Sequence, residues 1–146
     1  MKLIKQPLYS KIHQLLPIAC IDLVIFHKSK ILLIKRDVEP AKNQYWFPGG
    51  RIMRGESFVE AANRIAKSEV GLTISKLTNI GIGNLLFKED PFGHGLGTHT
   101  VSFIYKCQTS NNAPSLDNNH IDYIWWNGKS GKYHPYVKAF AIKAKL

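Results

Sequence analysis

Residues 50–72, which read GRIMRGESFVEAANRIAKSEVGL, contain the clearest structural signal in the chain. Ser57 is followed three residues later by Glu60, and this pair forms a capping box, the signature of a helix N-terminus. Gly71 lies where a residue in the left-handed conformation would end the helix. The stretch therefore predicts a helix over residues 58–70.

The apolar face of this predicted helix carries one carboxylate. Residues placed about 100° apart gather on one broad arc, which comprises Phe58, Val59, Ala61, Ala62, Ile65, Ala66 and Val70. Glu69 lies near the middle of this arc, whereas Glu60 and Arg64 lie on the opposite side, where an ordinary pair four residues apart is expected. Because desolvation of a carboxylate is costly, Glu69 must either pair with a Lys or Arg or bind a metal.

Regular elements are also predicted on both sides of this helix. Runs of β-branched and apolar residues predict a hairpin over residues 17–26 and 31–34, and strands over 77–87, 98–107 and 121–126. Residues 45–50, with a proline and paired glycines, predict no regular element, and residues 134–145 predict a last helix. This order indicates an α/β (α+β) fold in which helices pack on a mixed sheet.

Length and composition limit the organisation of the chain. Its 146 residues, 45% of them apolar, predict one domain over residues 1–146. Cys20 and Cys107 stand in apolar runs, which indicates buried thiols in a reducing compartment. The longest apolar stretch, residues 15–26, is broken by Asp22, and no secretion signal is recognisable. We therefore expect a cytoplasmic protein without a membrane partner.

The charge balance favours an anionic partner. Lys and Arg number 20 and Asp and Glu number 10, which gives a formal net charge of +10. Such an excess favours the phosphates of a nucleotide, although a basic surface that serves solubility alone is the alternative. We expect no nucleic-acid partner, because the chain contains no RNP-like motif.

The pattern within residues 50–72 resembles the Nudix box, G-x5-E-x7-R-E-U-x-E-E-x-G-U with U aliphatic. The positions in register are Gly50, Glu56, Arg64, Glu69, Gly71 and Leu72. The resemblance implies the Nudix fold, a mixed sheet sandwiched between helices, and hydrolysis of a nucleoside diphosphate linked to another group. Ile65 and Ser68, however, replace two glutamates of the box. A helix with Glu69 alone suits one Mg²⁺ ion better than a multi-metal cluster, and a degenerate, inactive box is the alternative.

The absence of these two box glutamates makes the chain similar to one branch of the superfamily, the GDP-mannose mannosyl hydrolases. Residues 35–36 (KR), 40–41 (PA), 45–51 (YWFPGGR) and 119–123 (NHIDY) also resemble that branch. The resemblance implies that His120 is the general base, a role suited to an imidazole near neutral pH. It also implies that Glu69, the carbonyl of Gly49 and the side chain of Asn119 hold Mg²⁺, with Asn119 in place of the usual Gln.

The branch also implies residues that bind the substrate. Arg36 and Arg51 would contact the diphosphate in the reaction, since planar guanidinium groups match phosphate oxygens. Tyr9 would stack on guanine and Asp22 would hold the sugar. Solvated arginines, a core tyrosine and a structural carboxylate are the respective alternatives.

The box and the branch also imply roles for residues that do not bind the substrate or the metal, and the chain departs from the branch at two positions. Arg64 would orient Glu56 within the box and thereby support the site. Leu86 and Thr100 stand where the branch has a histidine near the sugar and a tyrosine on the leaving diphosphate.

The reaction implied by this resemblance is Mg²⁺-dependent hydrolysis of GDP-mannose, or of a related GDP-hexose, to GDP and the free sugar. Water would attack C1 with inversion, and Mg²⁺ and the arginines would replace the general acid of an inverting glycosidase. A conventional Nudix pyrophosphatase that breaks a phosphoanhydride, and an inactive module that binds nucleotide sugars, are the alternatives. The resemblance further implies a homodimer.

Overall fold

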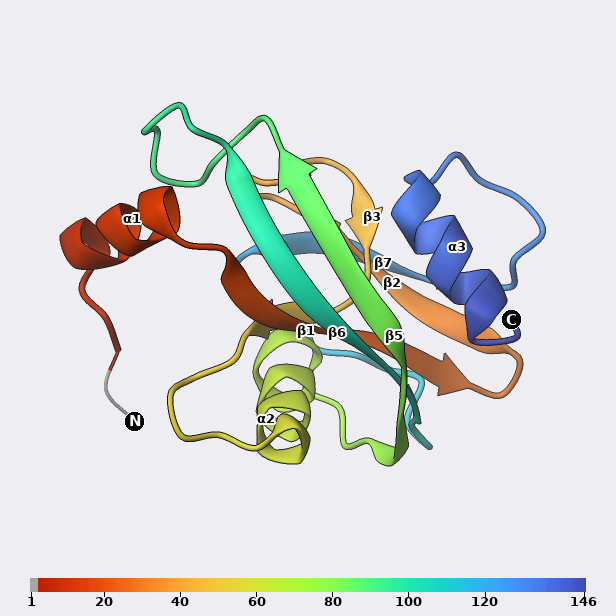
Figure 1. The fold of residues 1–146 in the computed structure, drawn as a ribbon. Helices are drawn as coiled ribbons and strands as arrows, with labels where there is room; N and C mark the ends of the chain where they lie inside the picture. The colour runs from red at the N-terminus through yellow and green to blue at the C-terminus, as the bar shows by residue number, and fades with distance from the viewer. Residues whose placement is uncertain (1–2) are drawn as a thin grey trace.

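The computed structural model describes residues 3–146, in which three helices and seven strands are formed (Figure 1). In chain order they are α1 (Gln6–Leu15), β1 (Ile18–His27), β2 (Lys30–Arg36), β3 (Tyr45–Trp46), β4 (Gly49–Arg51), α2 (Phe58–Val70), β5 (Ser75–Phe87), β6 (Thr98–Gln108), β7 (His120–Trp126) and α3 (Pro135–Lys143). The main path of the sheet runs β3-β2-β1-β6-β5, while β4 pairs with β1 and β7 pairs with β2.

The mixed character of the sheet comes from strand β1. This strand runs parallel to β6, in a register that extends from Ile18 opposite Thr100 to Phe26 opposite Gln108. Its pairings with β2 and β4 are antiparallel. The expected mixed α/β sheet is therefore confirmed.

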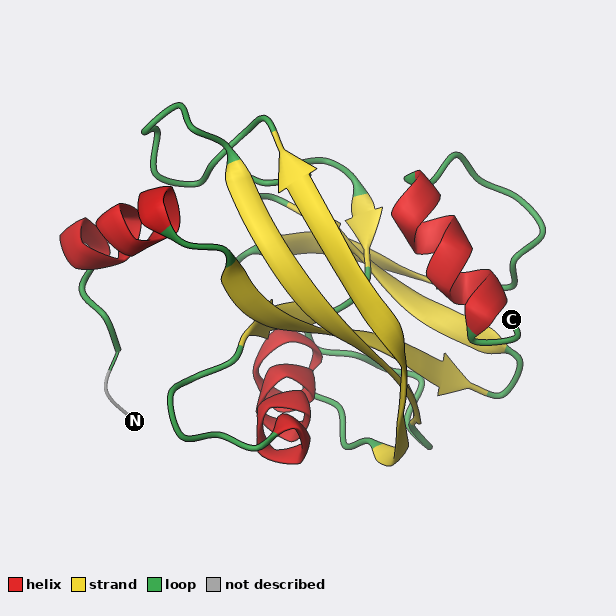
Figure 2. Cartoon of the chain, in the orientation of Figure 1, coloured by secondary structure: helices red, strands yellow, loops and turns green. Residues whose placement is uncertain are grey.

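Strands β1 and β2 are buried on both faces because helices cover both faces of the sheet. Alternate residues of the two strands, Val24, Phe26, Ile31 and Leu33, pack in one cluster with Tyr136, Val137 and Ala141 of α3. The intervening residues Ile21, Leu23, Ile25, Leu32 and Ile34 pack with Ala61, Ala62, Ile65 and Ala66 of α2. Figure 2 shows α2 and α3 on different sides of the strands, which agrees with the expected sandwich.

Helix α2 has the predicted bounds and the predicted caps. The Ser57 hydroxyl accepts a hydrogen bond from the Glu60 backbone N–H, and the Glu60 carboxylate accepts one from the Ser57 N–H. Gly71 ends the helix with a φ of 65°. The predicted apolar arc was too wide, however, because Phe58 and Val59 are exposed. These residues lie in the first turn, where the Phe58 ring packs against Phe103 instead of entering the main core.

Two parts of the fold differ from the expectation. Residues 45–50 were expected to be irregular, but they form parts of β3 and β4, whose pairings to β2 and β1 place Tyr45 opposite Lys35 and Gly49 opposite Asp22. Helix α1 was not expected at all. The last helix is confirmed but is shorter than predicted. None of the helices in residues 3–146 is long and apolar enough to cross a membrane.

Candidate functional site

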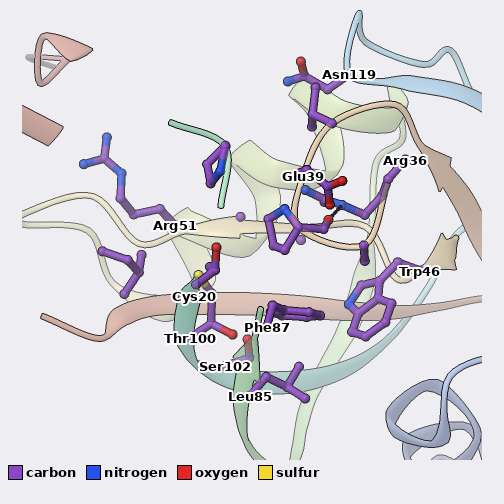
Figure 3. A pocket seen from close by; sticks show the side chains of 18 of the residues that line it. Cys20, Arg36, Glu39, Trp46, Arg51, Leu85, Phe87, Thr100, Ser102 and Asn119 are labelled. Atoms are coloured by element: carbon purple, nitrogen blue, oxygen red, sulfur yellow. Dashed lines mark hydrogen bonds between the residues drawn. The ribbon is translucent and has the colours of Figure 1, made fainter. Parts of the chain in front are cut away.

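A cleft of about 350 Å³ opens between the N-terminal helix, the sheet and the loop before β7. It brings together eight side chains or backbone positions that the sequence predicted as site residues, namely Tyr9, Asp22, Arg36, Gly49, Arg51, Glu69, Asn119 and His120. These residues come from segments spread over more than a hundred positions of the chain. Figure 3 shows Arg36 and Arg51 on opposite sides of this cleft.

Glu69 is the acidic residue that α2 contributes to the cleft. Its Oε2 accepts a 3.0 Å hydrogen bond from the Gly49 N–H. Burial raises the pKa of Glu69 to about 8, against the opposing effects of this hydrogen bond and of Arg36. Ile65, one turn earlier, is fully packed in the core. The helix therefore presents one carboxylate to the cleft, and the position where a second could stand is occupied by an aliphatic side chain of the core.

Asp22 lies on the floor of the cleft, in the central strand β1. Its Oδ2 accepts a 2.5 Å hydrogen bond from the Tyr136 hydroxyl, which belongs to α3. Burial raises the pKa of Asp22 to about 6, although hydrogen bonds from Tyr136 and Ser102 oppose this effect. The carboxylate therefore has structural partners besides any substrate.

The two cleft arginines have different surroundings. Arg36 donates from Nε to the Pro40 carbonyl at 2.6 Å. Burial lowers the pKa of Arg36, and the carboxylates of Glu69 and Asp22 act in the opposite direction. The Arg51 guanidinium carbon lies 4.5 Å from the centre of the Tyr9 ring, a cation–π contact. Arg36 is thus held by the loop between β2 and β3, whereas Arg51 packs on the aromatic residue expected to contact the base.

His120 begins strand β7 and is buried beside the cleft. Its Nδ1 lies 2.7 Å from Oδ1 of Asp117. Burial lowers the pKa of His120, and Asp117 partly offsets this effect. The neutral imidazole that a general base requires is consequently favoured near neutral pH.

Glu56 and Arg64 lie outside the cleft but support its edge. Arg64 donates from Nε to Glu56 at 2.5 Å and from Nη2 to the Arg51 carbonyl at 2.8 Å. The Arg64 hydrogen bond lowers the pKa of Glu56 to about 2. The predicted interaction of Arg64 with Glu56 is present, and Arg64 also holds the backbone of Arg51 through the Arg51 carbonyl.

The remaining candidate positions are less central. Asn119 is exposed at the rim of the cleft, and its carbonyl accepts a 2.8 Å hydrogen bond from the Asp37 N–H. Thr100 lines the cleft, whereas Leu86 is 75% exposed and does not contribute to its lining. Cys107 is buried as expected, but Cys20 is half-buried and borders the cleft.

The donor set suits a single hard cation that also binds substrate. Within residues 3–146, no group of three or more His, Cys, Asp and Glu side chains is arranged to hold a metal ion. Mg²⁺ is commonly held by one or two carboxylates and completed by phosphate oxygens and water. Glu69 supplies one such carboxylate, so a Mg²⁺ ion there would depend on the phosphates of the substrate.

The sequence did not predict three side-chain contacts at the cleft or beside it. Asp117 pairs with His120, Tyr136 pairs with Asp22, and His13 contacts His94 at 2.9 Å near the mouth of the cleft. The short spacing of Asp117 and His120 was a usable signal, because an Asp three residues before a His in a loop can bind its ring. No local pattern relates Tyr136 to Asp22.

The family model described as the NUDIX domain matches residues 17–130, and the chain belongs to this family. It is 23% identical over 124 residues to the low-salt glycan biosynthesis protein Agl8 of Haloferax volcanii, covering 85% of this chain and 80% of the relative. It is 37% identical over 78 residues to an ADP-ribose pyrophosphatase of Methanocaldococcus jannaschii, covering 53% of this chain and 46% of that protein.

Solved structures confirm the fold. A MutT NUDIX hydrolase from Burkholderia pseudomallei superposes with a TM-score of 0.71 at 19% identity, covering 89% of this chain and 97% of that chain. At this identity the likeness establishes the Nudix fold alone. The sequence-based assignment to the Nudix superfamily is therefore confirmed, while the GDP-mannose branch stays a prediction.

Proposed function

We propose that this Nudix chain hydrolyses a nucleoside diphosphate linked to a sugar and that it requires one Mg²⁺ ion. The proposal depends on Glu69, the single carboxylate of α2 that lines the cleft. Ile65 and Ser68 occupy the positions where further glutamates would support a multi-metal centre. The two arginines of the cleft favour a diphosphate ligand. The formal net charge of +10 agrees with an anionic substrate.

For this geometry we favour attack of water at the anomeric C1 of GDP-mannose or a related GDP-hexose. His120 takes a proton from the water at Nε2, GDP leaves with the electrons of the C1–O bond, and the sugar is released with inverted configuration. Arg36 and Arg51 stabilise the charge on the departing diphosphate, so that no second carboxylic acid is needed. Mg²⁺, held by Glu69 with the Gly49 carbonyl and the Asn119 amide, would supply Lewis-acid stabilisation of the same charge.

Cleavage of a phosphoanhydride is the second candidate, and the comparisons favour it over cleavage at C1. The relative from Methanocaldococcus jannaschii is named as an ADP-ribose pyrophosphatase, which supports attack at phosphorus. ADP-ribose is itself a nucleoside diphosphate linked to a sugar, so the two candidates share a substrate class and differ in the bond that breaks. A binding module without turnover is the third candidate, because α2 lacks the other box glutamates.

Hydrolysis in ¹⁸O-labelled water distinguishes these candidates. GDP-mannose and ADP-ribose are each incubated with the protein and Mg²⁺, and the products are analysed by mass spectrometry. Label in the free sugar released from GDP-mannose supports attack at C1, and label in a phosphate from either substrate supports the pyrophosphatase. If neither substrate yields products while both nucleotides bind, the binding module is favoured. Glu69→Gln should abolish the Mg²⁺-dependent reaction, and exposed Glu89→Gln should leave it unchanged.

The organisation of the protein is part of the proposal. We propose a cytoplasmic homodimer of chains that each contain a single Nudix domain over residues 1–146. Light scattering in solution measures the mass of the particle, and a value near 16.5 kDa, the mass of one chain, would reject the homodimer.

A further inference from the structure

Asp117, in the loop between β6 and β7, lies directly behind the proposed base. Its Oδ1 is 2.7 Å from Nδ1 of His120 and also accepts a 3.0 Å hydrogen bond from the Asn119 N–H. The side chains of His120 and Asp117 are 2% and 25% exposed. The carboxylate is therefore fixed in orientation by one backbone donor and directed at one ring nitrogen.

This contact determines where the imidazole carries its proton. An ionised carboxylate can only accept, so Nδ1 must be the protonated nitrogen of the neutral ring. The other nitrogen, Nε2, then has its lone pair free. Since a base needs that lone pair, the contact with Asp117 selects the tautomer in which Nε2 can receive a proton.

The backbone of the same loop is tied to helix α2. The Asp117 N–H donates to the Glu69 carbonyl at 3.0 Å, and the Ser115 N–H donates to the Val70 carbonyl at 2.9 Å. The loop that precedes His120 is thus held against the end of the helix that carries Glu69, the acidic residue of the cleft.

A register shift in the adjoining strand turns the ring inward. In the pairing of β2 with β7, His120 lies opposite Arg36 and Asp122 lies opposite Lys35, so Ile121 is the extra residue of a bulge. His120 is buried while Ile121 is exposed. Bulges commonly redirect a side chain beside a functional site, and this one directs the imidazole away from solvent.

We propose that Asp117 is a positioning residue that holds His120 as the Nδ1–H tautomer, with Nε2 available to the cleft, and keeps the ring in register with Glu69. The effect of Asp117 on catalysis rests on the proposed function, in which His120 is the base. The preference of His120 for one tautomer does not depend on that function. A purely structural role for Asp117, as the acceptor that closes the turn at Asn119, would leave the tautomer of His120 unchanged when Asp117 is replaced.

Nitrogen-15 NMR of protein labelled in its histidines tests the proposal without reference to activity. Spectra recorded at a mildly alkaline pH report which nitrogen of each neutral ring carries the proton, and His120→Gln identifies the signals of His120. The wild type should show the Nδ1–H tautomer. Predominance of the Nε2–H tautomer in the wild type would overturn the proposal without any Asp117 variant.

Two variants and one control sharpen this test. In Asp117→Ala the tautomer should shift towards Nε2–H. Asp117→Asn should retain Nδ1–H, because its amide oxygen can still accept from both the ring and the Asn119 N–H. Asp122→Asn serves as the matched control, since Asp122 is an exposed carboxylate two residues after His120 in β7 and contacts Tyr45. An unchanged tautomer in folded Asp117→Ala would contradict the proposal.

Activity provides the second readout. With a substrate identified by the ¹⁸O experiment, Asp117→Ala should lower kcat by about 10-fold to 100-fold, less than loss of the base itself, and should leave KM nearly unchanged. Asp117→Asn should recover most of that loss. A changed tautomer together with unchanged kcat would support the positioning of His120 and reject its role as base, so the two proposals can fail separately.

Discussion

Oδ2 of Asp22, in the central strand, accepts a 2.5 Å hydrogen bond from the hydroxyl of Tyr136, 114 residues later in the chain. Both residues are buried, so loss of this hydrogen bond is costly. The contact joins α3 to the floor of the cleft. A helix that contributes no predicted catalytic residue therefore affects the electrostatics of the site.

Tyr136→Phe should lower the free energy of unfolding. The substitution keeps the ring, which stacks on Trp46, but removes one of the two side-chain donors of the buried carboxyl and leaves it with Ser102. A hydrogen bond to a charged group contributes about 1.5–3 kcal/mol. Urea denaturation measures the change, and Tyr123→Phe, which alters a more exposed phenol, should have little effect. Equal stability of the Tyr136 variant and the wild type would show that this hydrogen bond contributes nothing net.

His120→Gln should lower turnover by about 100-fold or more while the protein remains folded, because general-base catalysis typically contributes a factor of that size. Glutamine approximates the length of the imidazole but cannot take up a proton at neutral pH. Steady-state kinetics on the substrate found by isotope labelling measure the loss. His99→Gln, which changes a histidine that does not line the cleft and contacts Asn84 instead, is the matched histidine control. Wild-type turnover in His120→Gln would exclude the assigned role.

Acid should destabilise the fold in part through Glu56. Arg64 lowers its folded-state pKa to about 2, whereas the ordinary value is 4.5. Because the folded pKa is the lower one, the contribution of Glu56 to stability is complete above about pH 4.5 and is lost as the pH falls towards 2. The free energy of unfolding of Glu56→Gln should therefore depend less steeply on pH across this range. If the free energy of unfolding changes equally with pH in the variant and in the wild type, this prediction is wrong.

Docking of α1 should weaken below neutral pH. The hydrogen bond between His13 Nδ1 and His94 Nε2 requires that one of these nitrogens lack a proton. Burial and the facing His94 lower the pKa of His13 below its ordinary 6.5. A histidine with a lowered folded-state pKa stabilises the docked state above the ordinary value and loses this contribution as the pH falls.

Hydrogen exchange detects this change. After correction for the intrinsic pH dependence, the amides of α1 should exchange faster at acidic pH relative to those of α2. His13→Leu should remove most of this pH dependence, because it eliminates the facing pair of rings. If the corrected exchange rates of the α1 amides keep a constant ratio to those of α2 at every pH, the expectation is wrong.

The sequence predicted best where the determining contacts are local. Ser57, Glu60 and Gly71 lie within the helix termini that they define, so the bounds of α2 could be predicted from them. Strands β3 and β4 could not, because Tyr45 and Gly49 form strand pairs with residues of β2 and β1. Helix α1 was missed because its N-cap residue, Lys5, forms no side-chain cap, and two of its leucines, Leu8 and Leu15, are exposed.

The same distinction applies to the site. The sequence correctly placed His120, Glu69 and the two arginines together in one site. This was possible because the motifs that contain them are specific in residue type and spacing. The partner of Asp22 could not be predicted, since Tyr136 reaches it only after α3 packs on the sheet. The partner of His120 depends on a loop whose conformation is fixed by backbone hydrogen bonds to α2.

The parallel pairing of β1 with β6 also has a kinetic consequence. Ile18 and Thr100 face each other across about eighty intervening residues, so the central ladder of the sheet closes a long loop before it gains its interior contacts. Proteins dominated by such non-local pairs fold more slowly than helical domains of similar stability. A stopped-flow refolding experiment should therefore find α2 forming ahead of this ladder, whose closure would limit the rate at which the cleft is assembled.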